Sequence, residues 1–286
     1  MYYKTQNLAV ILLGIALIYS ASGQTTVNQM PEPDYDKYRR ERLSVGIAAS
    51  FAYFNTTVTV FDKTENRSIY FSPEGMLGLD KTQFIPAIYG FWLPAKRHWV
   101  GFSFFTIDRE GNSVAVNRDI GNVNVTGNIL VSDRSSFYYL SYNYLLFYDD
   151  RAFILGALGL YGIDINADYK ISGEIKIDGE PDESNYYDEH FNRFAPFPLI
   201  GLQVQFAITP KWSVGTSASL IGGEYNGMSA FVFESKVLAR RVINKNISIL
   251  GELMFFNSDT EIDEKDQRSN SRYSFVALFL GVDVGL

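Results

Sequence analysis

The sequence predicts an all-β fold: a closed antiparallel transmembrane β-barrel of about ten strands, with eight or twelve as the alternatives. Three observations lead to this fold class. Apolar residues recur at every second position in many segments, the connections between these segments alternate between short and long, and the alternation in the last segment runs to the final residue. A period of two is that of a strand with two unlike faces.

The composition agrees with a barrel and excludes several other classes. The 286 residues suffice for one large barrel. Hydrophobic residues make up 47% of the chain, yet the mean hydropathy is only -0.05, so apolar and polar residues are interspersed. The absence of cysteine excludes a disulfide framework, a cysteine-based zinc site, a catalytic thiol and lipid attachment at a cysteine. The formal net charge of -7 opposes nucleic-acid binding.

The N-terminal residues have the layout of a secretory signal peptide. Lys4 precedes an apolar run at 8–18, and small residues follow at 21–23. We expect a cleaved signal peptide at 1–23, because this apolar run is too short to span a bilayer well, although an N-terminal anchor is the alternative. A polar, proline-containing lead-in is expected at 24–41, and the barrel at 42–286. Past the signal peptide no run approaches the about 20 apolar residues of a transmembrane helix.

The first five strands are expected where alternation or apolar content lies between turn residues. Segment 44–53 places large apolar residues such as Ile47 and Phe51 opposite small ones, and 99–108 sets Phe102 and Phe104 against Gly101. Segments 83–93 and 152–166 adjoin short turns. Segment 136–147 carries tyrosine and leucine on one face and Ser141 with Asn143 on the other, as an apolar exterior and a polar lumen require.

The last five strands follow the same rule. They are expected at 197–208, 212–220, 228–240, 247–256 and 273–286. In 197–208, Leu202 and Val204 lie opposite two glutamines. In 228–240, Phe231 and Phe233 lie opposite charged residues, and in the final segment aliphatic residues occupy every second position from Val276 onward. The other face of these strands is mostly serine, glycine, alanine, glutamine or charged.

The connections are sorted by length. The turns at 94–97, 148–151, 209–211 and 243–246 are short and would all lie at one end of the barrel. The connections at 56–82, 109–133, 167–192 and 259–270, and a shorter one at 222–226, would lie at the other end. A barrel inserted in one orientation has short turns on one side and longer loops on the other, whereas a soluble sandwich has no reason to sort loops in this way. Pieces of 109–133 could extend the strands as a hairpin beyond the membrane.

The final strand resembles the C-terminal signal strand of bacterial outer-membrane β-barrels. That strand ends on a hydrophobic residue with a glycine five positions earlier, and Gly281 and Leu286 match this pattern. Val284 and Leu286 stand where the family more often has aromatic residues. The resemblance implies a location in the outer membrane of a Gram-negative bacterium, surrounded by membrane lipid and lipopolysaccharide, with the last strand recognised by the barrel-assembly machinery.

Two groups of residues are candidate features of such a barrel. The tryptophans Trp92, Trp99 and Trp212 flank short turns, which suits an aromatic belt at the periplasmic interface, although buried core positions are the alternative. A second group is charged and has lumenal parity: Glu234, Lys236, Arg240 and Glu252. These charges would either pair with one another and support the barrel, or form a constriction that selects small ions or solutes. A ten-stranded barrel is narrow, so we expect a filled or slit-like lumen.

The sequence favours a non-enzymatic role without cofactor or metal: a structural or small-solute barrel with acidic surface loops. An outer-membrane hydrolase is the alternative, because lipid A deacylases and omptin-type proteases place a histidine near the outer rim, and His190 lies near Ser184 and Asp188. No motif of those families surrounds His190. The acidic loops could bind divalent cations, although they lack EF-hand spacing. A third possibility is a secreted soluble β-protein that binds a ligand or partner.

Overall fold

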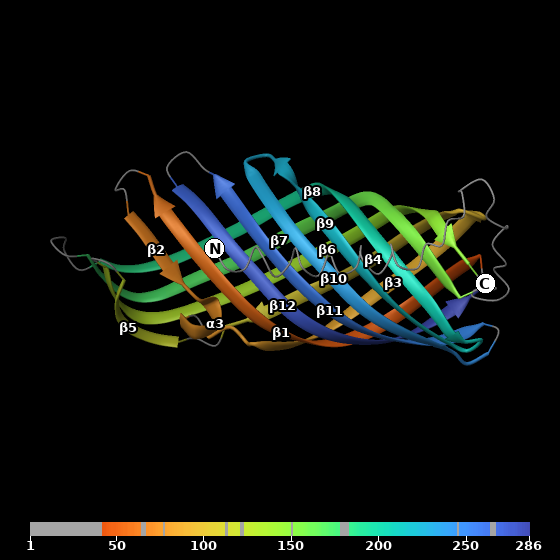
Figure 1. The fold of residues 1–286 in the computed structure, drawn as a ribbon. Helices are drawn as coiled ribbons and strands as arrows, with labels where there is room; N and C mark the ends of the chain where they lie inside the picture. Colours follow the sequence, from red (N-terminus) through yellow and green to blue (C-terminus); the bar gives the residue numbers. More distant parts are fainter. Residues whose placement is uncertain are drawn as a thin grey trace.

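The computed structural model describes residues 42–63, 67–76, 78–111, 114–120, 123–149, 151–177, 183–244, 246–263 and 267–286. These residues form a closed ring of ten antiparallel strands (Figure 1). In chain order the ring strands are β1 (Leu43–Asp62), β3 (Thr82–Ala95), β4 (His98–Glu110), β6 (Val123–Tyr148), β7 (Ala152–Ile177), β8 (Glu183–Thr209), β9 (Trp212–Tyr225), β10 (Met228–Val242), β11 (Ile247–Asp263) and β12 (Gln267–Gly285). The expected signal peptide and lead-in lie outside the described residues.

The ring closes between the first and last strands. β12 pairs with β1 from Ser44 opposite Gly285 to Asp62 opposite Gln267. Two further strands lie outside the ring: β2 (Arg67–Phe71) folds back onto β1, and β5 (Val114–Ile120) pairs with β6. A single helical turn, α3 (Pro73–Met76), follows β2. The predicted closed barrel of ten strands is therefore confirmed. In the connection at 109–133, β5 forms a hairpin with the start of the ring strand β6, so no two strands are added to the ring.

The ring strands differ greatly in length. β6 and β7 have 26 residues each and β8 has 27, whereas β3 and β9 have 14. The green strands accordingly project past the blue ones at the left end of Figure 1. The long connection expected at 167–192 is mostly strand, since β7 continues to Ile177 and β8 begins at Glu183. Backbone hydrogen bonds stabilise this extension, so it needs no apolar face. Because its sequence is polar, the alternation of apolar residues did not predict these strand residues.

Three of the four short turns, those at 148–151, 209–211 and 243–246, share one construction. The Oδ1 atom of Asp149 accepts hydrogen bonds from the backbone N–H groups of Arg151 and Ala152, both at 2.7 Å. Thr209 Oγ1 and Asn244 Oδ1 do the same for the backbone two and three residues further on. Side chains that bond to the backbone in this way stabilise tight turns. At the opposite end, Asn226 and Gly227 both have positive φ, as a two-residue hairpin turn requires.

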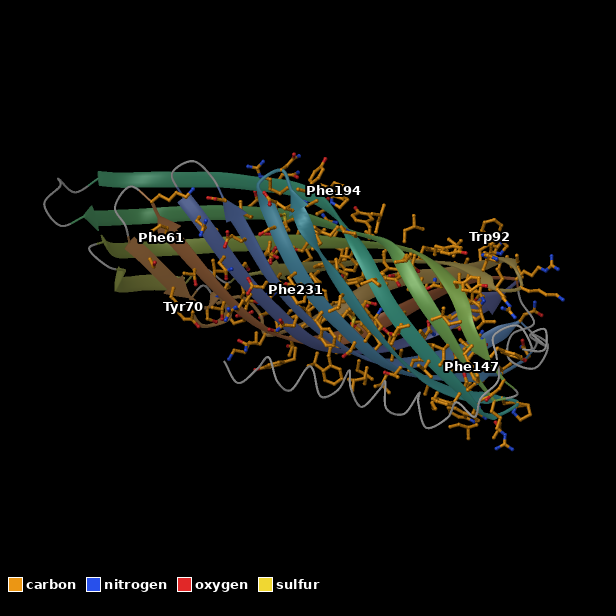
Figure 2. All side chains as sticks on the ribbon, turned by 45° about the horizontal axis from the view of Figure 1, so that its top comes forward. Phe61, Tyr70, Trp92, Phe147, Phe194 and Phe231 are labelled. Carbon is orange, nitrogen blue, oxygen red and sulfur yellow. The ribbon has the colours of Figure 1, made fainter. Side chains whose placement is uncertain are left out.

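The outer surface of the wall is apolar. Side chains such as Phe51, Phe194, Phe231 and Leu280 are exposed on it, and Figure 2 shows Phe194 and Phe231 on this surface. Phe231 is 58% exposed. Monomeric soluble proteins rarely expose so continuous an apolar surface, so the wall is suited to contact with lipid. Among the described residues, no helix is long and apolar enough to cross a membrane.

Candidate functional site: the barrel interior and its rims

A row of phenylalanines crosses the barrel interior, and we call it the cross-lumen row. Its successive ring centroids are 4.8 Å apart for Phe105 and Phe137, 5.8 Å for Phe137 and Phe256, 4.7 Å for Phe256 and Phe275, and 5.4 Å for Phe275 and Phe54. Phe137 belongs to β6 and Phe256 to β11, which stand five places apart in the ring of ten described strands. Their contact therefore joins opposite walls.

This row departs from the prediction of a polar lumen. The half of the interior nearer the long connections is an apolar core in which Phe197, Ile107 and Val232 are also buried. The sequence contains a pattern that predicts aromatic rings in the interior. Adjacent residues in a strand face opposite sides of the wall, so the doublets Phe104-Phe105 and Phe255-Phe256 must each send one ring inward.

A charged cluster lies beside this row, on the side nearer the short turns. Lys236 Nζ is 3.0 Å from Glu234 Oε1 and 3.9 Å from Glu252 Oε1. The same Nζ lies 5.9 Å from the ring centroid of Tyr139, which comes from β6. The structure thus brings together three of the four charges that the sequence singled out, and it places an aromatic ring from across the lumen over the lysine.

The fourth charge, Arg240, has a different partner. Its Nη2 atom is 2.6 Å from Asp283 Oδ2, which also accepts a hydrogen bond of 3.1 Å from Ser44 Oγ. The side chains of Arg240 and Asp283 are only 4% and 5% exposed, so this is a buried ion pair. Sequence reasoning missed Asp283 because the pair spans β10 and β12, which are not neighbours, and only the three-strand register reveals it.

The C-terminal strand presents two faces at the predicted assembly signal. Val284 and Leu286 are exposed on the outer surface, and Gly281 is buried on the inner one. A Cβ atom on Gly281 would lie 2.9 Å from Tyr89 Oη and 3.0 Å from the carbonyl oxygen of Ile47. Gly281 therefore leaves room for the Tyr89 ring inside the barrel, which gives this glycine a packing role in the finished structure.

The three tryptophans do not share one environment. Trp92 and Trp212 are exposed on the outer surface, and Figure 2 labels Trp92 near the short-turn end. Trp99 differs from the prediction, because it is only 6% exposed and stacks on Phe91 with ring centroids 5.8 Å apart. The reason is strand parity: Val100, Phe102 and Phe104 face outward, so Trp99 must face inward.

An ion pair that the sequence did not indicate lies at the opposite end of the barrel. Arg109 Nη2 is 2.6 Å from Glu74 Oε1 in α3, and their side chains are 0% and 3% exposed. Arg109 Nη1 donates to Thr56 Oγ1 at 3.2 Å, and the guanidinium lies 4.7 Å from the ring centroid of Phe54. Burial by itself would raise the pKa of Glu74, but the hydrogen bonds from Thr56 and Arg109 outweigh it and lower the pKa.

This ion pair lies beside a seam in the wall. The β3–β4 ladder ends at Ala87 opposite Phe105, although both strands continue. Beyond this point side chains make the connection: Gln83 Nε2 donates to the carbonyl oxygen of Asp108, and Arg109 Nε donates to that of Asp80 at 3.3 Å. A bridge between Leu79 and Gly111 adds one backbone contact. The segment around α3 therefore completes the wall where β3 does not.

The candidate catalytic residue lies in the extension beyond the rim. His190 belongs to β8, and its backbone stands opposite Asp168 of β7. Ser184 stands opposite Glu174, and Asp188 opposite Lys170, so the three residues proposed from sequence lie along one strand. None of the described segments gathers three carboxylate or histidine side chains that could hold a metal ion.

Comparisons with known proteins give the fold. No protein-family model matches the chain, and no curated protein matches it in sequence. Among solved structures it is similar to the outer-membrane protease OmpT from Escherichia coli, with a TM-score of 0.52 and 9% identity over 85% of this chain and 97% of that one. A Ralstonia pickettii toluene transporter, TbuX, matches at a TM-score of 0.39 and 9% identity, over 86% and 90%. The chain thus has the fold of the outer-membrane β-barrel class.

Proposed function

We propose that this chain is an outer-membrane protein with a sealed barrel, which serves as a non-conducting structural scaffold for the strands that project from its outer end. The observation that carries the proposal is the contact between Phe137 and Phe256, because it joins opposite walls through the lumen. An ion would have to displace this packed row to cross. The proposal favours the structural alternative over small-solute passage.

The orientation follows from the connections. Barrels of this class have short turns at the periplasmic end and longer segments outside, so β5 and the extensions of β6, β7 and β8 would lie outside the cell. Membrane lipid and lipopolysaccharide would then surround the apolar wall. The outward-facing Val284 and Leu286 at the chain end support recognition of β12 by the barrel-assembly machinery.

The proposal is tested by conductance in planar bilayers. We expect the folded full-length protein to produce no discrete current steps above the lipid baseline, because packed aromatic rings leave no aqueous path. Heat-modifiable gel migration of the same sample would establish that the barrel is folded. Reproducible steps from the folded wild-type protein would contradict a sealed lumen.

We also propose that the chain is not an enzyme. The hydrolase alternative retains one supporting observation, since the register places Asp168 opposite His190. OmpT, which shares the fold, is an outer-membrane protease. We expect purified wild-type protein and the His190→Ala variant to give equal, background rates with peptide, ester and lipid A substrates. Turnover by the wild type that is lost in the variant would overturn the non-enzymatic proposal.

A further inference from the structure

The short-turn end of the barrel carries a ring of cations, which we call the basic rim. Its members come from the start of β1, three of the turns and the end of β10: Arg42, Lys96, Arg97, Arg151, Lys211 and Arg241. All are exposed except Arg97, which is half-buried. They are therefore distributed around the circumference and do not form one patch.

Few carboxylates offset these charges. Within the described part of the chain, Asp149 is the exposed carboxylate at this end, and its Oδ1 atom accepts the turn hydrogen bonds. Asp283 is buried with Arg240. At the other end, the cations Lys63, Arg268 and Arg272 pair with Asp263 and Asp259. Among the described residues, the short-turn end is thus locally positive, although the chain as a whole has a net charge of -7.

The basic rim adjoins the edge of the apolar outer surface. Trp92, Trp212, Ile243 and Leu286 are exposed there, and the Arg241 guanidinium lies 5.3 Å from the ring centroid of Trp212. Tryptophan is enriched where acyl chains give way to head groups, and lysine and arginine extend their charged ends toward that interface. The cations are therefore placed at the depth at which phospholipid phosphates begin.

We propose that the basic rim binds the phosphate head groups of anionic phospholipids in the leaflet at the short-turn end. The proposal rests on the membrane placement proposed above. An anionic membrane surface attracts nearby lysine and arginine side chains, and the ring supplies six such groups. Because the groups surround the barrel, they would bind several separate lipids and fix the depth of the barrel in the bilayer.

The test compares two variants that remove equal charge from opposite ends. The first is Lys96→Gln/Arg151→Gln/Lys211→Gln, and the matched control is Lys63→Gln/Arg268→Gln/Arg272→Gln. Full-length proteins are folded into vesicles of phosphatidylcholine and phosphatidylglycerol in equal amounts and extracted in mild detergent, and the retained lipid is measured by native mass spectrometry.

We expect wild type and control to retain phosphatidylglycerol in preference to phosphatidylcholine, and the rim variant to lose this preference by about tenfold or more. Salt near 1 M should weaken it in the wild type. Heat-modifiable migration and protease protection report insertion separately, so failure to insert would overturn the membrane placement. Inserted wild-type protein without a lipid preference, or equal loss in rim variant and control, would overturn the basic rim as a lipid site.

Discussion

Arg240→Met is expected to lower the free energy of unfolding by about 3–5 kcal/mol at neutral pH, measured by urea titration of the folded barrel in lipid vesicles. The substitution nearly preserves side-chain volume but removes the counter-charge of Asp283, which is 2.6 Å away. Asp283 would then keep one hydrogen bond, from Ser44. A buried charge without its partner costs far more than the pair contributes, so the effect should approach that of a large core deletion.

Two further variants separate the charge effect from packing. Arg240→Met/Asp283→Asn removes both charges and should regain most of the lost stability. Arg241→Met is the matched control, because this neighbouring arginine faces outward against Trp212 and should cost at most about 1 kcal/mol. If the double variant were as unstable as Arg240→Met, lost packing and not the unpaired carboxylate would explain the result.

Phe137→Ala and Phe256→Ala should each destabilise the barrel by about 3–5 kcal/mol, because both rings are buried in the apolar core. Their effects should not add. The rings meet with centroids 5.8 Å apart, and contacting residues couple by about 0.5–3 kcal/mol in a double-mutant cycle. The double variant should also produce current steps in planar bilayers, because its wall-to-wall contact is gone.

Phe231→Ala is the control for this series. Phe231 is exposed on the outer surface of the wall. Its removal should therefore produce no current steps and should lower the free energy of unfolding much less. Strict additivity of the Phe137 and Phe256 substitutions would contradict a contact across the lumen. A folded double variant that produces no current steps would show that other residues close the lumen.

Much of the fold could be predicted from the sequence because barrel strands obey local rules. Alternation located the ring strands, and the sorting of connections by length distinguished their two ends. The boundaries failed where alternation became polar, as in the extension of β7 past Asn166. Beyond the rim neither face meets lipid, so backbone pairing alone defines the strand and the side-chain pattern fades.

The interior was predicted less well because its contacts are not local. Parity alone shows that Glu234, Lys236 and Glu252 share a side of the wall, but Arg240 pairs with Asp283 two strands away. The Arg109–Glu74 pair joins a ring strand to a helical turn within a connection, and no periodicity of the sequence predicts this contact. Phe137 and Phe256 meet only because the ring closes, so their contact follows from the number of strands.

The seam between β3 and β4 makes local unfolding uneven around the barrel. Where the ladders of the ring are continuous, a strand separates from its neighbour only if backbone hydrogen bonds break. Beyond Ala87 and Phe105, two side-chain hydrogen bonds, the Arg109–Glu74 pair and the single bridge between Leu79 and Gly111 hold the wall instead. This sector should therefore open at a lower free energy than the continuous ladders beside it, and its amide hydrogens should exchange with solvent before theirs.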